Sequence, residues 1–365
     1  MALVVAAMYA YAALLMARCQ KQTGAGTYQE LAELALGRRV SLFIEFFFYL
    51  ELAGSLMGYC ISIGDNLAHV FPNARLGIPG VLSAHNILLL LACLCILPTV
   101  WLRDLSALSF TSVWSVLNTL LLIISVFVAA TADSHIGFRH AIPAVELKGA
   151  PVAAGLYAFA FGGTTVYPSV YKSMRDPTKF TYVLLLSFGT ATGFVVGLGI
   201  MGASMFGSLT ASQVTLNLPP HKVTTHMALW LTVLTPTFMF ALVMSPISKS
   251  MDAGVNRRLR KYPARLQMAV ATLARSCVMA LIVVGAMALP YFNYVVALIG
   301  SSMTIAICLV FPCVFYAILC RDRLNRSSIA AIAIVSIFSA IAAVCGTIVS
   351  FQGLVESRKH HRSSS

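Results

Sequence analysis

Paired glycines interrupt an apolar run near the middle of the chain. The run covers residues 150–171, and its centre reads Phe161-Gly162-Gly163-Thr164-Thr165, with a proline at 168. A helix broken here would present free carbonyls at one half-helix end and free N–H groups at the other. Such ends bind cations or ammonium groups and anions, respectively. The candidate binding residues are Tyr157, Phe161, Gly162, Gly163, Thr164 and Thr165. A kink that serves only helix packing is the alternative.

A second set of hydroxyl groups flanks a proline in the run 226–247. Thr232 and Thr235 precede or adjoin Pro236 there. Threonine hydroxyls beside a proline commonly bond to backbone carbonyls of their own helix. They can also line a polar pathway. We therefore consider two roles for Thr232 and Thr235: substrate binding, and a structural bond to their own helix.

Two charged residues lie deep inside apolar runs. Glu51 and Arg275 each lie about ten residues into their runs, which is about 15 Å along a helix. An ionisable side chain near the bilayer midplane is costly and is a functional candidate by default. Glu51 is our candidate for proton coupling. A structural role is the alternative, either as a polar anchor or in an intramembrane ion pair between Glu51 and Arg275.

The overall composition indicates where these residues lie. Of the 365 residues, 59% are hydrophobic and only 10% are charged. A soluble domain averages about 25% charged residues, because a polar surface must cover its core. The composition excludes an ordinary soluble enzyme, a disordered chain and a fibrous protein. It predicts an all-α polytopic membrane protein.

About ten windows are long and apolar enough to cross a bilayer, which takes about 20 residues each. They are 2–18, 41–63, 84–101, 106–131, 150–171, 181–206, 226–247, 266–289, 293–319 and 328–351. The connections between them are short. We therefore expect one transmembrane domain over residues 1–351 and a short, basic, Ser-rich tail over 352–365.

The basic residues predict an orientation. Most of the 25 Lys and Arg residues lie in one of the two alternating sets of loops. By the positive-inside rule that set is cytosolic. The net charge of +13 then reflects membrane topology rather than nucleic-acid binding. The apolar start at residue 2 is consistent with an ordinary first span, with a signal peptide, or with a protein that begins upstream.

Other motifs predict no chemistry. Residues 197–202 match a dinucleotide-binding fingerprint, but they lie inside an apolar run without a preceding strand, so we read them as a packing face. The eight histidines and nine cysteines show no metal-ligand spacing. No nucleophile is placed with an acid or base. We expect no enzyme activity, no metal and no cofactor.

Several stretches carry a resemblance to a known family. They are Tyr49-Leu50-Glu51-Leu52, Gly64-Asp65-Asn66-Leu67, Phe71-Pro72-Asn73, Leu97–Ser106, Gly155-Leu156-Tyr157, Thr215–Pro219 and Leu298-Ile299-Gly300-Ser301. In these stretches the chain resembles the amino acid/auxin permease family, and specifically its plant-type vacuolar amino acid transporters.

The resemblance implies an eleven-helix transporter of the LeuT-like, inverted-repeat, broken-helix fold, with the first helix absent from this chain. It implies a small amino acid as substrate and protons as the coupling ion. It also implies the vacuolar membrane, with the plasma membrane or another endomembrane as alternatives. One departure lies in the eighth span of the family, where Asn-Pro-Phe-Thr-Lys is replaced by Thr235-Pro236-Thr237-Phe238-Met239.

Two functional hypotheses follow. The first is a secondary active transporter of amino acids that works by alternating access and is coupled to protons. The alternative is an N-terminally truncated, non-transporting relative that acts as an amino acid sensor or a partner subunit. Binding of amino acids without flux would favour the second hypothesis. The sequence leaves the oligomeric state open.

Overall fold

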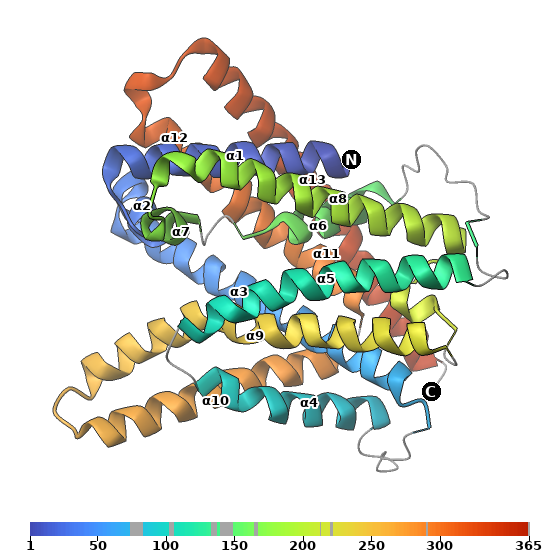
Figure 1. Cartoon of the computed structure of the whole chain (residues 1–365). Coiled ribbons are helices and arrows are strands. Elements are labelled where there is room, and N and C mark those ends of the chain that lie inside the picture. Colours follow the sequence, from blue (N-terminus) through green and yellow to red (C-terminus); the bar gives the residue numbers. More distant parts are fainter. Residues whose placement is uncertain are drawn as a thin grey trace. The chain divides into compact units, whose positions relative to one another are not determined.

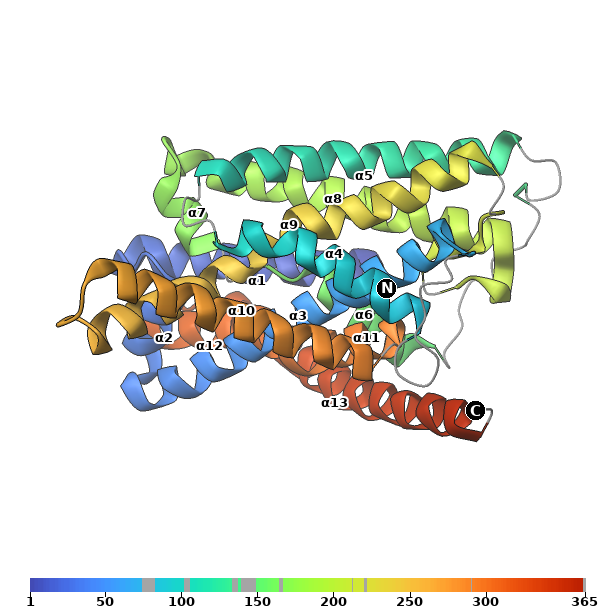
Figure 2. The same cartoon turned by 90° about the horizontal axis from the view of Figure 1, so that it is seen from below.

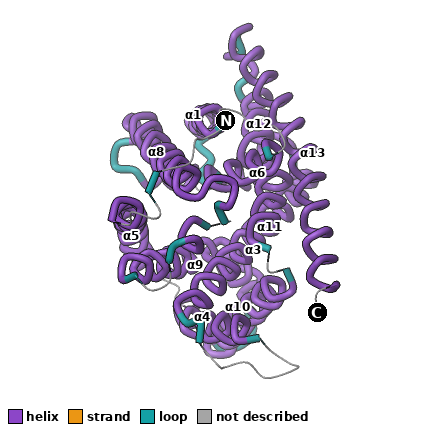
Figure 3. Tube along the Cα trace, turned by 90° about the vertical axis from the view of Figure 1, so that its right-hand side faces the viewer, coloured by secondary structure: helices purple, strands orange, loops and turns teal. Residues whose placement is uncertain are grey.

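We describe a computed structural model of the chain, covering residues 1–73, 83–101, 106–132, 137–138, 149–163, 167–211, 213–219, 222–289 and 291–363. Every regular element in these ranges is helical, as Figure 3 shows. Within them, nine helical segments are long and apolar enough to cross a membrane. The predicted all-α membrane class is confirmed.

Most of the helices follow the predicted windows, whereas the helix Tyr28–Leu36 falls between two of them. They are α1 (Ala2–Thr23), α2 (Tyr28–Leu36), α3 (Arg38–Val70), α4 (Ala84–Trp101), α5 (Ser106–Ala132), α6 (Ala150–Phe161), α7 (Tyr167–Ser173), α8 (Phe180–Phe206), α9 (Val223–Arg258), α10 (Ala264–Ala288), α11 (Phe292–Ile299), α12 (Phe311–Leu319) and α13 (Arg326–Ser363). Two π-helical turns, η5 (Gly300–Thr304) and η6 (Ala306–Val310), lie in the helical run between α11 and α12.

Three differences from the expected windows stand out. The window 150–171 divides into α6 and α7, which is why nine long segments are present rather than ten. Helix α9 extends to Arg258, eleven residues beyond its apolar window. Helix α13 runs on to Ser363, so residues 352–363 continue the helix where a tail was expected. Apolarity marks the part of a helix that lies in lipid, whereas the helix itself can continue into water.

The chain divides into two compact units. The first comprises Met1–Glu51, Pro143–Gly197 and Asn293–Ser365, and the second comprises Leu52–Ile142 and Leu198–Phe292. The sequence analysis treated residues 1–351 as one domain. Each unit is assembled from segments that are distant in the sequence, so hydropathy along the chain could not separate them.

In the first unit, α6 packs against η5 and α13, and α1 packs against α12 and α6 (Figure 1). Glycines allow the closest of these contacts. A methyl group added to Gly155 would collide with the carbonyl of Ala297, and one added to Gly300 would collide with the carbonyl of Gly155. Small residues at such contacts are typical of packing between membrane helices.

In the second unit, α9 lies along α5 and also contacts α4 and α10 (Figure 2). A buried cluster links α5, α8 and α9 with the loop before α9: Val126, Ala129, Ala130, Met205, Leu218 and Ala228. Polar contacts add to this packing. The fully buried Asn66 of α3 donates to the Gln213 side chain at 2.6 Å and accepts from the Thr215 hydroxyl at 3.0 Å.

Candidate functional site

Helix α6 stops at the paired glycines. Gly162 has extended backbone angles (φ −57°, ψ 158°), and its N–H bonds back to the Phe159 carbonyl at 3.1 Å. Gly163 has a φ of 124°, a conformation that side-chain-bearing residues rarely adopt. The discontinuity expected from the sequence is therefore present. Thr164 and Thr165, which were also predicted to bind, lie outside the described residues.

The break leaves a polar helix end inside an apolar unit. The last carbonyls of a helix have no intrahelical partners, and the negative end of the helix dipole lies among them. Phe161 at the end of α6 is buried, and Tyr157 one turn earlier is half-buried. The arrangement suits a ligand that brings a positive group.

A buried acid lies beside this break. The Thr304 hydroxyl in η5 donates to a carboxylate oxygen of Glu51 at 3.3 Å, and Glu51 is only 8% exposed. A methyl group added to Gly162 would come within 2.7 Å of the Thr304 methyl. Thr304 therefore touches both the break and Glu51. The sequence analysis missed Thr304, although three hydroxyl-bearing residues within 301–304 interrupt an apolar window.

Tyr9 of α1 is a second residue that the sequence analysis missed. Its ring packs against that of Phe161 at a centroid distance of 6.4 Å. The side chain is fully buried, and its hydroxyl has no hydrogen-bond partner in the described part of the chain. Buried hydroxyls are normally bonded, so an unbonded one beside a helix break is available to a ligand.

The half-helix α7 and the π-helical turns are held by polar contacts. The Gln20 side chain donates to the Pro168 carbonyl at 2.6 Å, which fixes α7 to α1. The Tyr28 hydroxyl donates to the Ile307 carbonyl in η6 at 2.8 Å. π-Helical turns are frequent at functional sites because they offset side chains from the regular helical register. Here η5 supplies Thr304.

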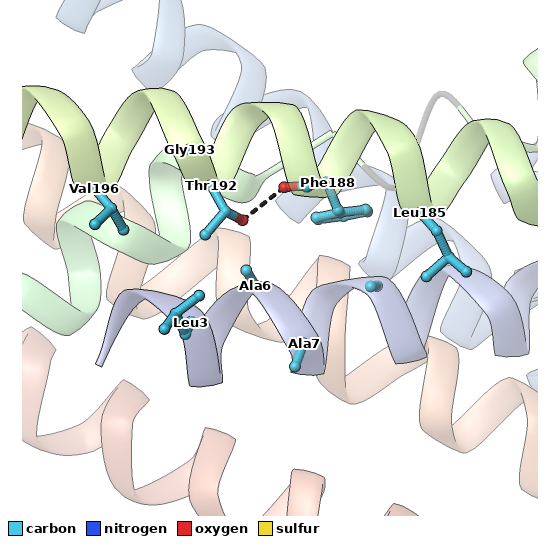
Figure 4. Close-up of a pocket in the computed structure, with 10 residues that line it drawn as sticks. Leu3, Ala6, Ala7, Leu185, Phe188, Thr192, Gly193 and Val196 are labelled. Carbon is cyan, nitrogen blue, oxygen red and sulfur yellow. Dashed lines mark hydrogen bonds between the residues drawn. The ribbon is translucent and has the colours of Figure 1, made fainter.

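An apolar groove adjoins the break in the first unit. It is an open groove of about 460 Å³ between α1 and α8, and Figure 4 shows Leu3 and Ala6 across from Leu185, Phe188 and Val196. Phe188 also packs against Phe161 at 6.2 Å and against Tyr167 at 6.3 Å. The Thr192 hydroxyl in this groove bonds to the Phe188 carbonyl of its own helix. None of the predicted site residues lines the groove.

The two predicted threonines of α9 lie in the second unit. The Thr232 hydroxyl donates to the Ala228 carbonyl at 2.9 Å, and the Thr235 hydroxyl donates to the Leu231 carbonyl at 3.0 Å. Thr235 also accepts from the Asn118 amide of α5 at 2.6 Å. Both hydroxyls thus have the structural role considered from the sequence. Their contact with substrate stays a prediction.

Arg275 has an acidic partner other than the one considered from the sequence. Its side chain is buried, and its guanidinium pairs with Asp252 of α9 in the same unit. It also donates to the carbonyls of Val100 and Trp101, both at 3.3 Å, where α4 ends. The sequence analysis did not consider Asp252, which lies beyond the apolar window that ends at 247. The ion pair of Arg275 with Glu51 that we considered from the sequence stays a prediction.

Among the described residues, no group of three or more His, Cys, Asp or Glu side chains is placed to hold a metal ion. The chemistry at the break consists of hydroxyls, one carboxylate and backbone carbonyls. These groups can bind a small polar molecule or exchange a proton. They form no arrangement of nucleophile and base.

Comparison with known proteins identifies the family. Residues 1–356 match the family described as Transmembrane amino acid transporter protein. In Arabidopsis thaliana, the amino acid transporter AVT1E is 35% identical over 347 residues, and AVT1D is 34% identical over 340 residues. These matches cover 94% and 92% of this chain, but 65% and 61% of the two relatives. The amino acid transporter AVT1H is 34% identical, and the match covers 80% of its length. The chain is a multi-pass membrane protein that belongs to the transmembrane amino acid transporter family.

Proposed function

We propose that this chain carries amino acids across a membrane by alternating access, with the α6–α7 break as the substrate site. The observation that carries the proposal is the break itself, which lies next to a buried carboxylate in a member of this family. An amino acid zwitterion presents an ammonium group, and the carbonyl end of α6 together with Glu51 offers the complementary negative charge.

The residues of the first unit have distinct proposed roles. The α6 carbonyls bind the ammonium group, and Tyr157, Phe161 and the Tyr9 hydroxyl shape and orient the bound molecule. Thr164 and Thr165 follow Gly163 in the sequence, and we retain them as candidates for binding the carboxylate of the substrate. From the second unit we retain Thr232 and Thr235 as substrate contacts, on the strength of the sequence alone.

We further propose proton coupling through Glu51 and residence in the vacuolar membrane. The first rests on the burial of Glu51 beside the break, and the second on the resemblance to vacuolar transporters. The inverted-repeat fold of that family is proposed on the same ground. None of the relatives' printed names specifies a substrate beyond amino acids, and we propose none.

A glycine-to-alanine pair tests the site. Gly162→Ala places a methyl group against Thr304, whereas Gly199→Ala in α8 adds one where no atom lies within 4 Å. Both variants are reconstituted in liposomes, and the uptake of radiolabelled amino acids is measured. We expect Gly162→Ala to lose at least tenfold in kcat/KM and Gly199→Ala to match the unmodified chain.

The same measurements distinguish a failure of the proposed site from a failure of the proposed function. If Gly162→Ala transports as well as Gly199→Ala, the substrate does not bind at the break. If the unmodified chain binds amino acids without moving them, the sensor hypothesis replaces transport. Replacing both Gly162 and Gly163 by Leu should abolish uptake while insertion into the membrane is retained.

A further inference from the structure

The turn between α9 and α10 presents a dense group of cations. Five basic residues fall within nine positions, and all are exposed: Arg257, Arg258, Arg260, Lys261 and Arg265. None of them forms an ion pair with any described residue. The nearest described acid in sequence, Asp252, is bound by Arg275. The positive charge at this turn is therefore not neutralised by the described part of the chain. We call these five residues the basic turn.

The basic turn is ordered by its own hydrogen bonds. The Gln267 side chain in the first turn of α10 donates to the Leu259 carbonyl at 3.0 Å and to the Tyr262 carbonyl at 2.9 Å. These bonds fix the connection from the end of α9 to the start of α10. The cations are thus presented by a defined surface, which lowers the entropy lost when an anion binds.

An apolar groove begins at the last cation of this turn. It encloses about 490 Å³ and is lined by Trp101, Arg265, Met268, Ala269, Thr272, Leu273 and Ser276. Met268 is 52% exposed and Leu273 is 65% exposed. The Trp101 indole donates to the Ser276 hydroxyl at 3.1 Å, which connects α4 to α10 beside the groove.

The length of α10 places the groove at the membrane border. Helix α10 ends at Ala288, and about 20 residues cross the hydrocarbon core, so the core extends to about residue 269. Arg265 lies one turn farther, at the level of the lipid headgroups. The groove from Met268 to Ser276 then lies at the depth of acyl chains. Tryptophan is typical of this interfacial zone.

We propose that the basic turn and this groove bind an anionic phospholipid. The phosphate contacts Arg265 and the cations of the turn, and one acyl chain lies along Met268, Ala269 and Leu273. A neutral lipid would leave the cations uncompensated, and a soluble anion would leave the apolar wall exposed. Clusters of basic residues next to a membrane helix bind acidic headgroups in this way. The proposal does not depend on what the chain transports.

Trp101 provides the test because it lines the groove. The chain has three tryptophans, so the variant Trp114→Phe/Trp230→Phe leaves Trp101 as the sole tryptophan, which is excited selectively at the red edge of the absorption band. The full chain is reconstituted in phosphatidylcholine liposomes containing a small fraction of dibrominated lipid, which quenches tryptophan on contact. We expect dibrominated phosphatidylserine to quench Trp101 more strongly than dibrominated phosphatidylcholine at the same fraction. The preference should decline as salt is raised, because salt screens exposed charges.

Arginine-to-glutamine variants test which cations bind the acidic headgroup. Arg257→Gln/Arg258→Gln and the single change Arg265→Gln should each reduce the preference for the acidic lipid, by up to about fivefold for each charge removed. Arg38→Gln/Arg39→Gln removes an exposed pair at the start of α3 and should leave the preference unchanged. Circular dichroism confirms that each variant is folded.

Three results would overturn the proposal. Equal quenching by the two brominated lipids would make the groove an ordinary boundary-lipid surface. A preference that survives in Arg265→Gln and in the Arg257/Arg258 variant would locate acidic-lipid binding elsewhere. Equal losses in the Arg38/Arg39 control would show that net charge, rather than the basic turn, sets the preference.

Discussion

Protonation of Glu51 would change the hydrogen bond that this acid makes beside the break. When ionised, a carboxylate only accepts hydrogen bonds, and the Thr304 hydroxyl donates to it. When protonated, the acid can donate, so the Thr304 hydroxyl can turn to accept. The Thr304 methyl lies beside Gly162, so this proton-dependent hydrogen bond is next to the break. Buried intramembrane acids are costly to keep, which supports a functional role for this one.

Glu51→Gln should separate transport from its driving force. The amide keeps the size of the side chain and its hydrogen-bonding capacity but cannot exchange a proton. We expect this variant to bind amino acids and to equilibrate them, but to lose accumulation driven by a pH gradient. Uptake by proteoliposomes with and without an imposed gradient measures this.

Glu45→Gln is the matched control for that measurement. Glu45 lies six residues earlier on α3, near its start, and should be dispensable for coupling. If Glu51→Gln still accumulates substrate in response to the gradient, Glu51 is not the coupling residue, and its contact with Thr304 is structural.

At the scale of elements, the sequence predicted the helices and the break but not the contacts between helices. Apolar windows located α1, α4, α5, α8 and α10 to within a few residues, and Gly162-Gly163 located the break. The π-helical turns were invisible, because their residues fit a regular apolar helix equally well. Asp252 was missed because it lies past the apolar window, on a polar extension of α9. Thr304 and Tyr9 could be connected to the break only in three dimensions.

Gly155 is where α6 approaches the α11–η5 backbone most closely. Gly155→Ala would drive a methyl group into the Ala297 carbonyl, which belongs to a helical backbone and cannot move aside. Overpacking of this kind costs about 1–3 kcal/mol. We expect a lower melting temperature for the purified chain. Gly193→Ala, where no atom lies within 4 Å, should melt as the unmodified chain does; equal melting of the two variants would disprove close packing at Gly155.

Arg275 connects three helices of the second unit, α10, α9 and α4. Arg275→Met breaks the pair with Asp252, and breaking a buried pair costs about 3–5 kcal/mol. The double variant Arg275→Met/Asp252→Asn removes both charges and should recover part of that loss. A thermal-unfolding cycle over the four proteins measures the coupling. If the stability losses of the two single variants add up to that of the double variant, Arg275 and Asp252 do not stabilise each other.

At the scale of the whole molecule, composition and loop charges were sufficient to identify a multi-pass membrane protein, because bilayers demand long apolar helices. The division into two units could not be predicted from the sequence, because each unit combines segments from both halves of the chain. Family membership follows from similarity over residues 1–356. In the proposed mechanism the choice of substrate would depend on side-chain positions around the break, and neither composition nor helix spacing encodes those.

The central claim is that this chain moves amino acids, and uptake by proteoliposomes containing the full chain tests it most directly. A mixture of radiolabelled amino acids is supplied outside, with and without an imposed pH gradient, and protein-free liposomes give the background. We predict saturable uptake above that background, increased by the gradient and competed by unlabelled substrate. Saturable binding to the same chain in detergent, with no accumulation in liposomes under either condition, would contradict the account.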